Sequence, residues 1–181
     1  MVDLTLAAWA LLEVGVRVRE ALHGKGRRDR DRGTRTVVAL AICAAIVAAV
    51  GAGSAQLLPI AEPLRTAGVV VMWLGLALRV WSIAMLGESF RTTVEVERGQ
   101  RVISAGPYRF VRHPSYAGLL LVFAGFGVAL GDWLSLAACV LLPLPALVWR
   151  IHVEEAELTR VLGEAYRTYQ SHTARLIPGV W

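Results

Sequence analysis

The chain has 181 residues, of which 56% are hydrophobic and 18% are charged, and its mean hydropathy is +0.54. A soluble domain of this size carries more polar surface, so the composition excludes an ordinary soluble globular protein. The formal net charge of +5 would suit nucleic acid. The basic residues, however, fall in connections between apolar segments, where membrane topology accounts for them. We therefore expect an integral membrane protein with no nucleic-acid partner.

Five apolar segments are predicted to enter the membrane, because roughly 20 apolar residues are needed to cross a hydrocarbon core of about 30 Å. They cover residues 4–19, 36–58, 67–86, 115–131 and 133–150. The first lacks the basic start and small-residue cleavage site of a secretory signal, so we expect it to remain as a helix. Only Gly131 and Asp132 separate the last two, which predicts a tight helical hairpin whose short arms need not reach the far side.

Basic residues are distributed unevenly among the connections. Those near the first connection are Arg17, Arg19, Lys25, Arg27, Arg28, Arg30, Arg32 and Arg35. The second connection, residues 60–66, has only Arg65 against Glu62. By the positive-inside rule the first connection is cytoplasmic, which puts the N-terminus outside and the C-terminus inside. We expect one multi-pass domain of the plasma or inner membrane, with N-terminal spans in 1–66 and a second region in 67–181.

Two further patterns complete the predicted all-α membrane bundle. Small residues in the second segment favour close helix packing in lipid, namely Ala44, Ala45, Ala48, Ala49, Gly51 and Gly53. After residue 150 a spacing of three and four residues links Glu155, Leu158, Leu162, Tyr166 and Tyr169. That spacing predicts an amphipathic cytoplasmic helix that ends near Thr173.

A few residues inside the apolar segments need a partner or a packing role. Glu13 and Arg79 are costly in a membrane unless they are paired or line a cavity, so they either pair with each other or with the cytoplasmic clusters, or have a functional role. Cys43 and Cys139 lie in apolar runs without metal-binding spacing. We expect neither a disulfide nor a metal site, and we interpret both cysteines as packing residues.

The densest group of polar and aromatic residues is the run Gly106-Pro107-Tyr108-Arg109-Phe110-Val111-Arg112-His113-Pro114-Ser115-Tyr116-Ala117-Gly118. Pro114 is well tolerated in the first turn of a helix, so Arg112 and His113 are predicted to stand at a cytoplasmic helix start. Such a start suits a carboxylate or phosphate ligand. The alternative is that the arginines bind lipid headgroups and that His113 only caps the helix.

A second cluster follows the fifth segment, at Arg150, His152, Glu154 and Glu155. The two adjacent carboxylates can pair with Arg112 or Arg150, or they can accept the hydroxyls or ammonium of a ligand. Helix capping and charge balance are the structural alternative.

These clusters resemble the isoprenylcysteine carboxyl methyltransferase family and the related phospholipid methyltransferases. The resemblance rests on the run 106–118, on Glu154-Glu155, on Gly163-Glu164-Ala165-Tyr166, on Tyr169 and on Ile177-Pro178, and it covers about residues 68–181. It implies an integral membrane methyltransferase that uses S-adenosylmethionine and has no Rossmann sheet. By position, the cofactor-binding residues would be Tyr108, Arg112, His113, Pro114, Tyr116, Gly118, Glu154 and Glu155.

Methyl transfer from a sulfonium is a direct displacement, so an ionised carboxylate acceptor needs no general base; alignment and exclusion of water supply the acceleration. We expect a lipophilic small-molecule acceptor that enters from the bilayer, with a carboxyl group favoured. Arg91 and Glu155 are the predicted catalytic residues, and Arg91 either orients the acceptor carboxylate or serves as an interfacial cation.

Two other functions stay open at this point. Membrane sterol reductases resemble the C-terminal half and bind NADPH in the corresponding pocket, although they are usually longer. A non-catalytic protein that binds lipids or a partner is the other alternative. The sequence identifies neither the acceptor nor the oligomeric state.

Overall fold

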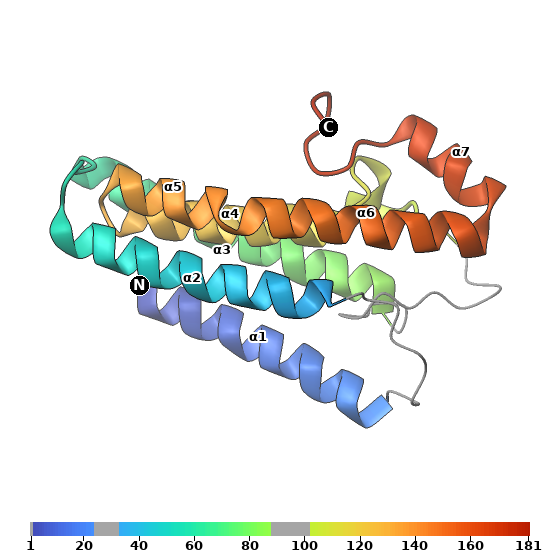
Figure 1. Cartoon of the computed structure of the whole chain (residues 1–181), viewed down its shortest axis with the longest axis horizontal. Helices are drawn as coiled ribbons and strands as arrows, with labels where there is room; N and C mark the ends of the chain where they lie inside the picture. Colours follow the sequence, from blue (N-terminus) through green and yellow to red (C-terminus); the bar gives the residue numbers. More distant parts are fainter. Residues whose placement is uncertain (1, 24–32, 88–101) are drawn as a thin grey trace.

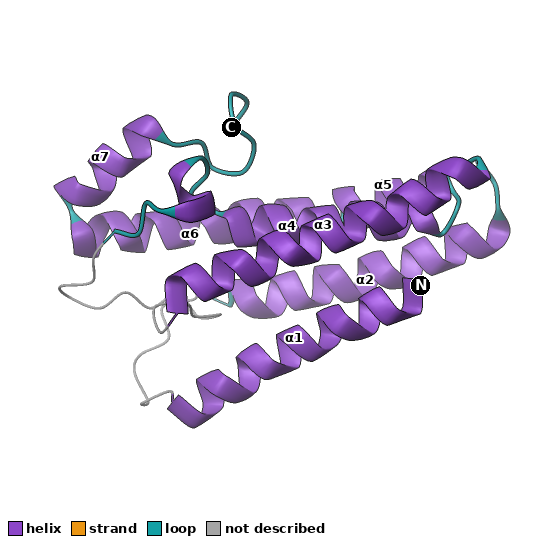
Figure 2. Cartoon of the chain, turned by 180° about the vertical axis from the view of Figure 1, so that it is seen from behind, coloured by secondary structure: helices purple, strands orange, loops and turns teal. Residues whose placement is uncertain are grey.

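A computed structural model describes residues 2–23, 33–87 and 102–181 (Figure 1). The helices are α1 (Val2–His23), α2 (Thr34–Ala55), α3 (Glu62–Leu86), η2 (Gly106–Arg109), α4 (Pro114–Ala129), α5 (Trp133–Leu141), α6 (Pro143–Leu162) and α7 (Glu164–His172). Extended pairing in these residues is limited to two isolated bridges, so the predicted all-α class is confirmed. The helices form an elongated bundle, with α7 set across one end (Figure 2).

Three of the helical stretches are long and apolar enough to cross a membrane. They are Thr34–Ala55, Glu62–Leu86 and Trp133–Leu162, the last being α5 and α6 taken together. The apolar parts of the other two predicted segments are shorter, at Ala7–Val16 and Pro114–Ala129. Helices therefore occur at all five predicted places, and the protein is suited to a membrane, while a count of five complete spans stays a prediction.

The last membrane helix is longer than the sequence analysis predicted. The predicted apolar segment ends at residue 150, but the helix that contains its end, α6, continues to Leu162 and stops only at Gly163, whose φ is 59°. The residues after 150 are mostly good helix formers, so leaving an apolar environment does not break the helix. Gly163 adopts the positive φ that L-residues avoid, and it divides the predicted tail helix between α6 and α7. α7 ends at His172, with Thr173 as its C-cap, close to the predicted position.

The predicted hairpin between α4 and α5 is present. Gly131 takes a φ of 81° in the turn, and Asp132 is the N-cap of α5, accepting from Leu134 N at 2.8 Å. The Asp132 side chain is fully buried and also accepts from Leu58 N at 2.7 Å. One carboxylate therefore caps a helix and fastens the α2–α3 connection to the hairpin.

α3 and α4 approach each other closely through paired glycines. A Cβ on Gly125 would lie 2.4 Å from Gly68 O, and a Cβ on Gly75 would lie 2.7 Å from Gly118 O. Small residues allow such close approach in lipid, where packing drives helix association. The close packing predicted for the second segment also occurs, since a Cβ on Gly53 would lie 3.1 Å from Leu130 Cβ. The alanines of α2 at positions 45 and 49 are indeed buried, but a Cβ at position 51 would have no neighbour within 4 Å.

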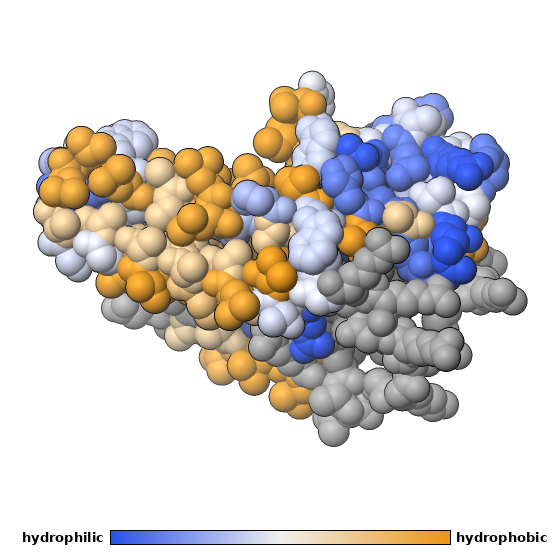
Figure 3. Space-filling model, viewed as in Figure 1, coloured by the Kyte–Doolittle hydropathy of each residue, from blue (hydrophilic) through white to orange (hydrophobic). Residues whose placement is uncertain are grey.

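The two ends of the bundle differ in polarity. Apolar residues cover most of its length, whereas hydrophilic residues gather where α6 ends and α7 begins (Figure 3). The interior contains Met72, Phe123 and Leu147, each less than 2% exposed. Large apolar side chains such as Leu40 and Val47 point outward, at 65% and 73% exposure, as expected of a surface that faces lipid.

Candidate functional site

The candidate site is built where the start of α4 meets the segment after α7, at the polar end of the bundle (Figure 1). Arg112 N donates to Ala174 O at 2.8 Å, and His113 N donates to Arg175 O at 3.0 Å. Ala174 N donates to Phe110 O at 3.3 Å. These backbone bonds join two segments that lie far apart in the sequence, and they bring the C-terminal residues against the helix start.

Local sequence explains how the α4 side of the site is formed. Gly106 takes a φ of 58° and leads with Pro107 into the single turn η2. α4 then begins at Pro114, with His113 at the N-cap position, as predicted. Proline suits that first position because its missing N–H would have no helical partner there. The turn and the helix start together bring Tyr108 and His113 inward, and both are nearly buried, at 6% and 5% exposure.

Glu155 is the centre of a buried ionic cluster. Its carboxylate accepts from Arg112 Nε at 2.7 Å and from Arg175 Nε at 2.9 Å, and it lies 3.4 Å from His113 Nε2. The Glu155 side chain is 5% exposed. Arg112 also donates to carbonyl oxygens at the end of α7, including Gln170 O at 3.1 Å. The glutamate thus ties α6, the α4 start and the C-terminal segment together.

Glu154 is placed differently from its neighbour. Tyr116 donates its hydroxyl to Glu154 Oε2 at 2.9 Å, and the same hydroxyl accepts from Arg150 Nε at 2.7 Å. Arg150 further donates to Thr34 Oγ1 at 3.0 Å, which links α6 to the start of α2. The Glu154 side chain is 29% exposed. In the described part of the chain, its Oε1 atom makes no hydrogen bond, so this oxygen is available to a ligand.

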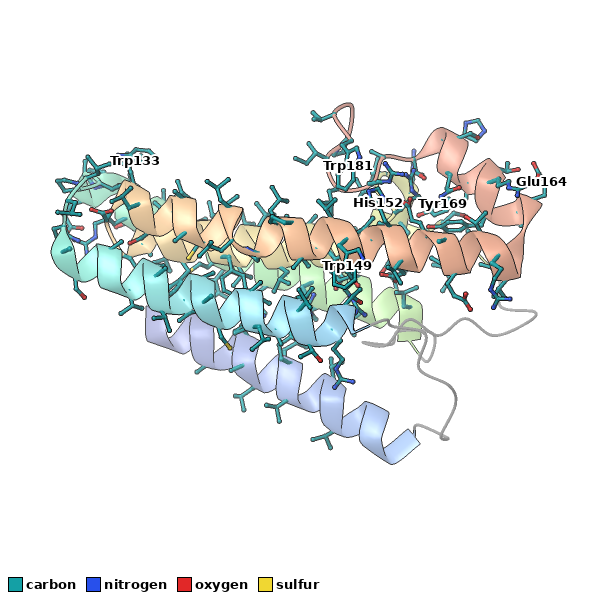
Figure 4. The ribbon with its side chains drawn as sticks, in the orientation of Figure 1. Trp133, Trp149, His152, Glu164, Tyr169 and Trp181 are labelled. Carbon is teal, nitrogen blue, oxygen red and sulfur yellow. The ribbon has the colours of Figure 1, made fainter. Side chains whose placement is uncertain are left out.

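Two tyrosines, the buried Tyr108 and the half-buried Tyr169, close the site from η2 and α7. Tyr108 donates to Ser82 O at 3.3 Å, and Tyr169 donates to Tyr108 O at 2.6 Å. Burial raises the pKa of Tyr108 above its ordinary range and raises the pKa of Tyr169 to about 12. Both phenols therefore stay protonated near neutral pH and act as hydrogen-bond donors. Figure 4 shows Tyr169 between α7 and α6, on the same side of the bundle as His152 and Trp181.

A second ionic pair lies beside the site, within the apolar helices. Arg79 Nε and Nη2 both lie 2.6 Å from Glu13 Oε1, so the predicted pairing of these two residues is confirmed. Arg79 Nη1 donates to Ser115 Oγ at 2.8 Å and to Ser115 O at 3.0 Å. Arg79 lies one helical turn before Ser82, the residue that accepts from Tyr108.

The structure brings most of the predicted site residues together. Those in the cluster are Tyr108, Arg112, His113, Tyr116, Glu154 and Glu155. Pro114 is buried at the helix start. Gly118 faces α3, about 200° around the helix from Tyr116, so its observed role is helix packing. Arg91 lies outside the described residues.

Sequence reasoning did not single out Arg175 or Ser115. Arg175 precedes Leu176-Ile177-Pro178, so its place beside a motif was the available signal. Ser115 lay inside the quoted run 106–118, but nothing in the sequence linked it to Arg79. Both contacts depend on tertiary structure, because Arg175 meets Glu155 at 20 residues' separation and Ser115 meets Arg79 at 36.

Comparisons with known proteins agree with this arrangement. The profile of the phospholipid methyltransferase family matches residues 64–165. A protein-S-isoprenylcysteine O-methyltransferase from Schizosaccharomyces pombe is 30% identical over 116 residues, which are 63% of this chain and 49% of that protein. A methanethiol S-methyltransferase from a Pseudomonas species is 27% identical over 124 residues, which are 61% of this chain and 45% of that protein.

A solved structure is also similar. The eukaryotic intramembrane Ras methyltransferase, an isoprenylcysteine carboxyl methyltransferase, matches with a TM-score of 0.61 and 30% identity, over 65% of this chain and 43% of that one. The chain thus spans about half the length of the relatives it matches. The family profile covers 102 of the 181 residues, from 64 to 165, and includes the contact of Glu155 with Arg112 and that of Glu154 with Tyr116. The chain therefore belongs to the phospholipid methyltransferase family.

Proposed function

We propose that this protein is an S-adenosylmethionine-dependent methyltransferase that methylates the carboxylate of a lipophilic small molecule. The cofactor would bind at the polar end of the bundle, which we place on the cytoplasmic side, and the acceptor would enter from the bilayer. The observation that supports this proposal is the cluster in which Tyr116, Arg112 and His113 meet the glutamate pair of α6. All of these residues lie in the part of the chain that matches the family profile.

The polar side chains of the site fit the charged and polar groups of this cofactor. S-adenosylmethionine presents an ammonium, a carboxylate and ribose hydroxyls, so it needs a carboxylate and a cation at fixed positions. Glu154 is partly exposed and keeps one oxygen available to hydroxyl or ammonium donors. Arg175 uses Nε for Glu155 while its side chain is 30% exposed, which leaves part of its guanidinium for a carboxylate. When bound, the cofactor supplies an electrophilic methyl group that an ionised carboxylate attacks directly.

Glu155 has a positioning role in this proposal. Two arginines and a histidine surround its oxygens, so it holds the walls of the site rather than contacting the reactants. The chain needs no base for an acceptor that is already ionised, and its contribution is alignment and exclusion of water. The protonated Tyr108 and Tyr169 support these walls from η2 and α7.

Arg79 supports a carboxylate as the acceptor group. The residue is 5% exposed and lies in a membrane-length helix, and its guanidinium already binds one carboxylate, that of Glu13. A fixed guanidinium in an apolar setting recognises carboxylates through paired hydrogen bonds. The two relatives with different acceptors, an isoprenylcysteine carboxyl group and methanethiol, show that the acceptor atom must be tested directly.

Calorimetric titration of the detergent-solubilised protein with S-adenosylhomocysteine, with NADPH as the comparison, tests the cofactor class. We expect saturable binding of S-adenosylhomocysteine alone. Binding of NADPH alone would favour a membrane reductase, and binding of neither would favour a non-catalytic lipid-binding protein.

Methylation assays then test the acceptor class. N-acetyl-S-farnesylcysteine offers a lipophilic carboxylate, while a long-chain thiol and phosphatidylethanolamine offer sulfur and nitrogen. We expect transfer of label from methyl-labelled cofactor only to the carboxylate, as a base-labile ester. Transfer to the thiol or amine instead would overturn the carboxyl assignment.

A further inference from the structure

α1 lies along the outside of the bundle, against α3 (Figures 1 and 2). It spans Val2–His23 and therefore precedes the region that matches the family profile, residues 64–165. Its contact with Arg79 comes from outside the family's shared part. This contact is a feature that the proposed function leaves unexplained.

The guanidinium of Arg79 has two edges that are used differently. The Nη1 atom is held by Ser115 at the start of α4, at 2.8 Å from Oγ and 3.0 Å from the carbonyl oxygen. The Nε and Nη2 atoms both meet Glu13 Oε1 at 2.6 Å. α4 therefore fixes the orientation of Arg79, while the paired edge that best recognises a carboxylate is covered only by α1 among the described residues.

Part of α1 faces away from the bundle, although its Val16 is buried. Leu11 and Val14 point away from the bundle, at 73% and 57% exposure. Trp9 packs edge-on against Phe123 with ring centroids 5.4 Å apart, but its buried Nε1 has no hydrogen-bond partner among the described residues. An unsatisfied buried donor weakens the docking of the element that carries it. Among the described residues, the Glu13–Arg79 pair is a polar contact that holds α1 in place.

We infer that Glu13 occupies on Arg79 the position of the acceptor's carboxylate, so that α1 is a gate which a lipophilic acid displaces. This inference rests on the proposed function and deepens it. An acid that arrives through the bilayer carries the same functional group as Glu13 and competes for the same two N–H donors. Exchange of one carboxylate for another keeps the buried guanidinium paired throughout, which avoids the cost of an isolated charge.

The same exchange accounts for product release. In the reaction a carboxylate oxygen forms a bond to the methyl carbon while the carbon–sulfur bond breaks, and no proton moves. The acceptor changes from an anion to a neutral ester, and the sulfonium becomes a thioether. Because the neutral ester no longer forms an ion pair with Arg79, Glu13 returns to Arg79 and displaces the ester. The gate therefore closes after the product leaves.

The test measures lipid binding without catalysis, in the full chain reconstituted in nanodiscs. Palmitate and methyl palmitate are titrated into the wild-type protein, Glu13→Gln and the control Glu62→Gln, which alters an exposed pair with Arg65. We expect Glu13→Gln to bind palmitate about tenfold more tightly, with methyl palmitate unchanged, because the competing charge is gone. Glu62→Gln should match the wild type for both ligands.

Equal or weaker palmitate binding by folded Glu13→Gln would overturn the gate, as would an equal gain for methyl palmitate. If Glu13→Gln does not fold, Glu13→Asp serves in its place, because it keeps the charge but shortens the reach to Arg79. We expect Glu13→Asp to bind palmitate more tightly than the wild type does. An unchanged palmitate affinity would overturn the gate. Failure of the proposed function is seen separately, as absence of S-adenosylhomocysteine binding by the wild-type protein.

Discussion

Arg112 and Glu155 are 43 residues apart in the sequence, yet their side chains meet at 2.7 Å with 8% and 5% of their surfaces exposed. Replacing Glu155 by Gln leaves two arginines near a neutral amide in a buried setting. We expect a loss of about 3 kcal/mol in unfolding free energy, the usual scale for breaking a buried ion pair from one side. Thermal unfolding in detergent measures the change, and limited proteolysis reports release of the segment after α7.

Glu164→Gln is the matched control for that variant. Glu164 is 82% exposed and lies 3.5 Å from Arg167, so its loss should change stability by well under about 1 kcal/mol. Equal effects of the two substitutions would show that the Glu155 cluster does not hold the C-terminal segment.

Tyr116→Phe isolates the role of a single hydroxyl group. The hydroxyl lies between Arg150 and Glu154, at 2.7 Å and 2.9 Å, and it orients the carboxylate that we assign to the cofactor. We expect the affinity for S-adenosylhomocysteine to fall about tenfold, since one hydrogen bond to a charged group is lost. Calorimetry measures the affinity. An unchanged affinity in a folded variant would remove Glu154 from the cofactor site.

Gly125→Ala should weaken the α3–α4 contact. The new methyl would lie 2.4 Å from Gly68 O and 2.6 Å from Met72 N, both of them backbone atoms that move only with their helix. We expect a loss of about 1–3 kcal/mol, the usual cost of overpacking. Gly51→Ala makes the same change in α2 with nothing within 4 Å, so its unfolding temperature should not fall. A similar fall in both variants would contradict the glycine contact.

Asp132→Ala removes a helix cap and a tether at once. The carboxylate accepts from Leu134 N and from Leu58 N, at 2.8 Å and 2.7 Å. We expect a loss of about 2–4 kcal/mol, which combines a cap of about 1 kcal/mol with a buried N–H left unpaired. Asp132→Asn keeps one acceptor oxygen and should lose less. Chemical or thermal unfolding ranks the wild type and the two variants by stability. A lower stability of Asp132→Asn than of Asp132→Ala would contradict this interpretation.

High pH should undock α7. Burial raises the pKa of Tyr169 from its ordinary value of 10.0 to about 12, so the folded protein favours the neutral phenol. The resulting stabilisation is complete below pH 10.0 and is lost as the pH rises through about 12. Ultraviolet absorbance of tyrosinate and proteolysis of α7 should therefore change together in that window. Tyrosinate formation in the folded protein at pH 10.0 would contradict the buried hydrogen bond to Tyr108.

Much of the fold could be predicted because apolar runs and turn residues are local signals. The five helix positions, the hairpin at Gly131 and the start of α4 at Pro114 all follow from short stretches of sequence. The end of α6 could not be predicted from hydropathy, because that property marks where apolar surface stops. The helix itself continues until Gly163 breaks it.

For the candidate site, too, some features could be predicted from the sequence and others could not. Arg112, His113 and the glutamate pair were predicted as a set, since their residue types and the resemblance pointed to them together. The distinct roles of Glu154 and Glu155 could not be predicted, because adjacent residues on a helix point about 100° apart and meet different neighbours. Gly118 was assigned to the cofactor through its motif, although its contact is with α3. The catalytic role of Arg91 stays a prediction.

α5 and α6 together form one helical stretch, Trp133–Leu162, which carries Glu154 and Glu155. Its 30 residues extend about 45 Å, more than the roughly 30 Å of hydrocarbon that a membrane presents. Trp133 marks one end and Trp149 lies well along its length, ahead of the glutamates (Figure 4). The position of Glu154 along this stretch is therefore set by the number of helical residues that precede it, not by a loop. A single inserted residue between Trp149 and Glu154 would turn both carboxylates by about 100° and lift them by about 1.5 Å.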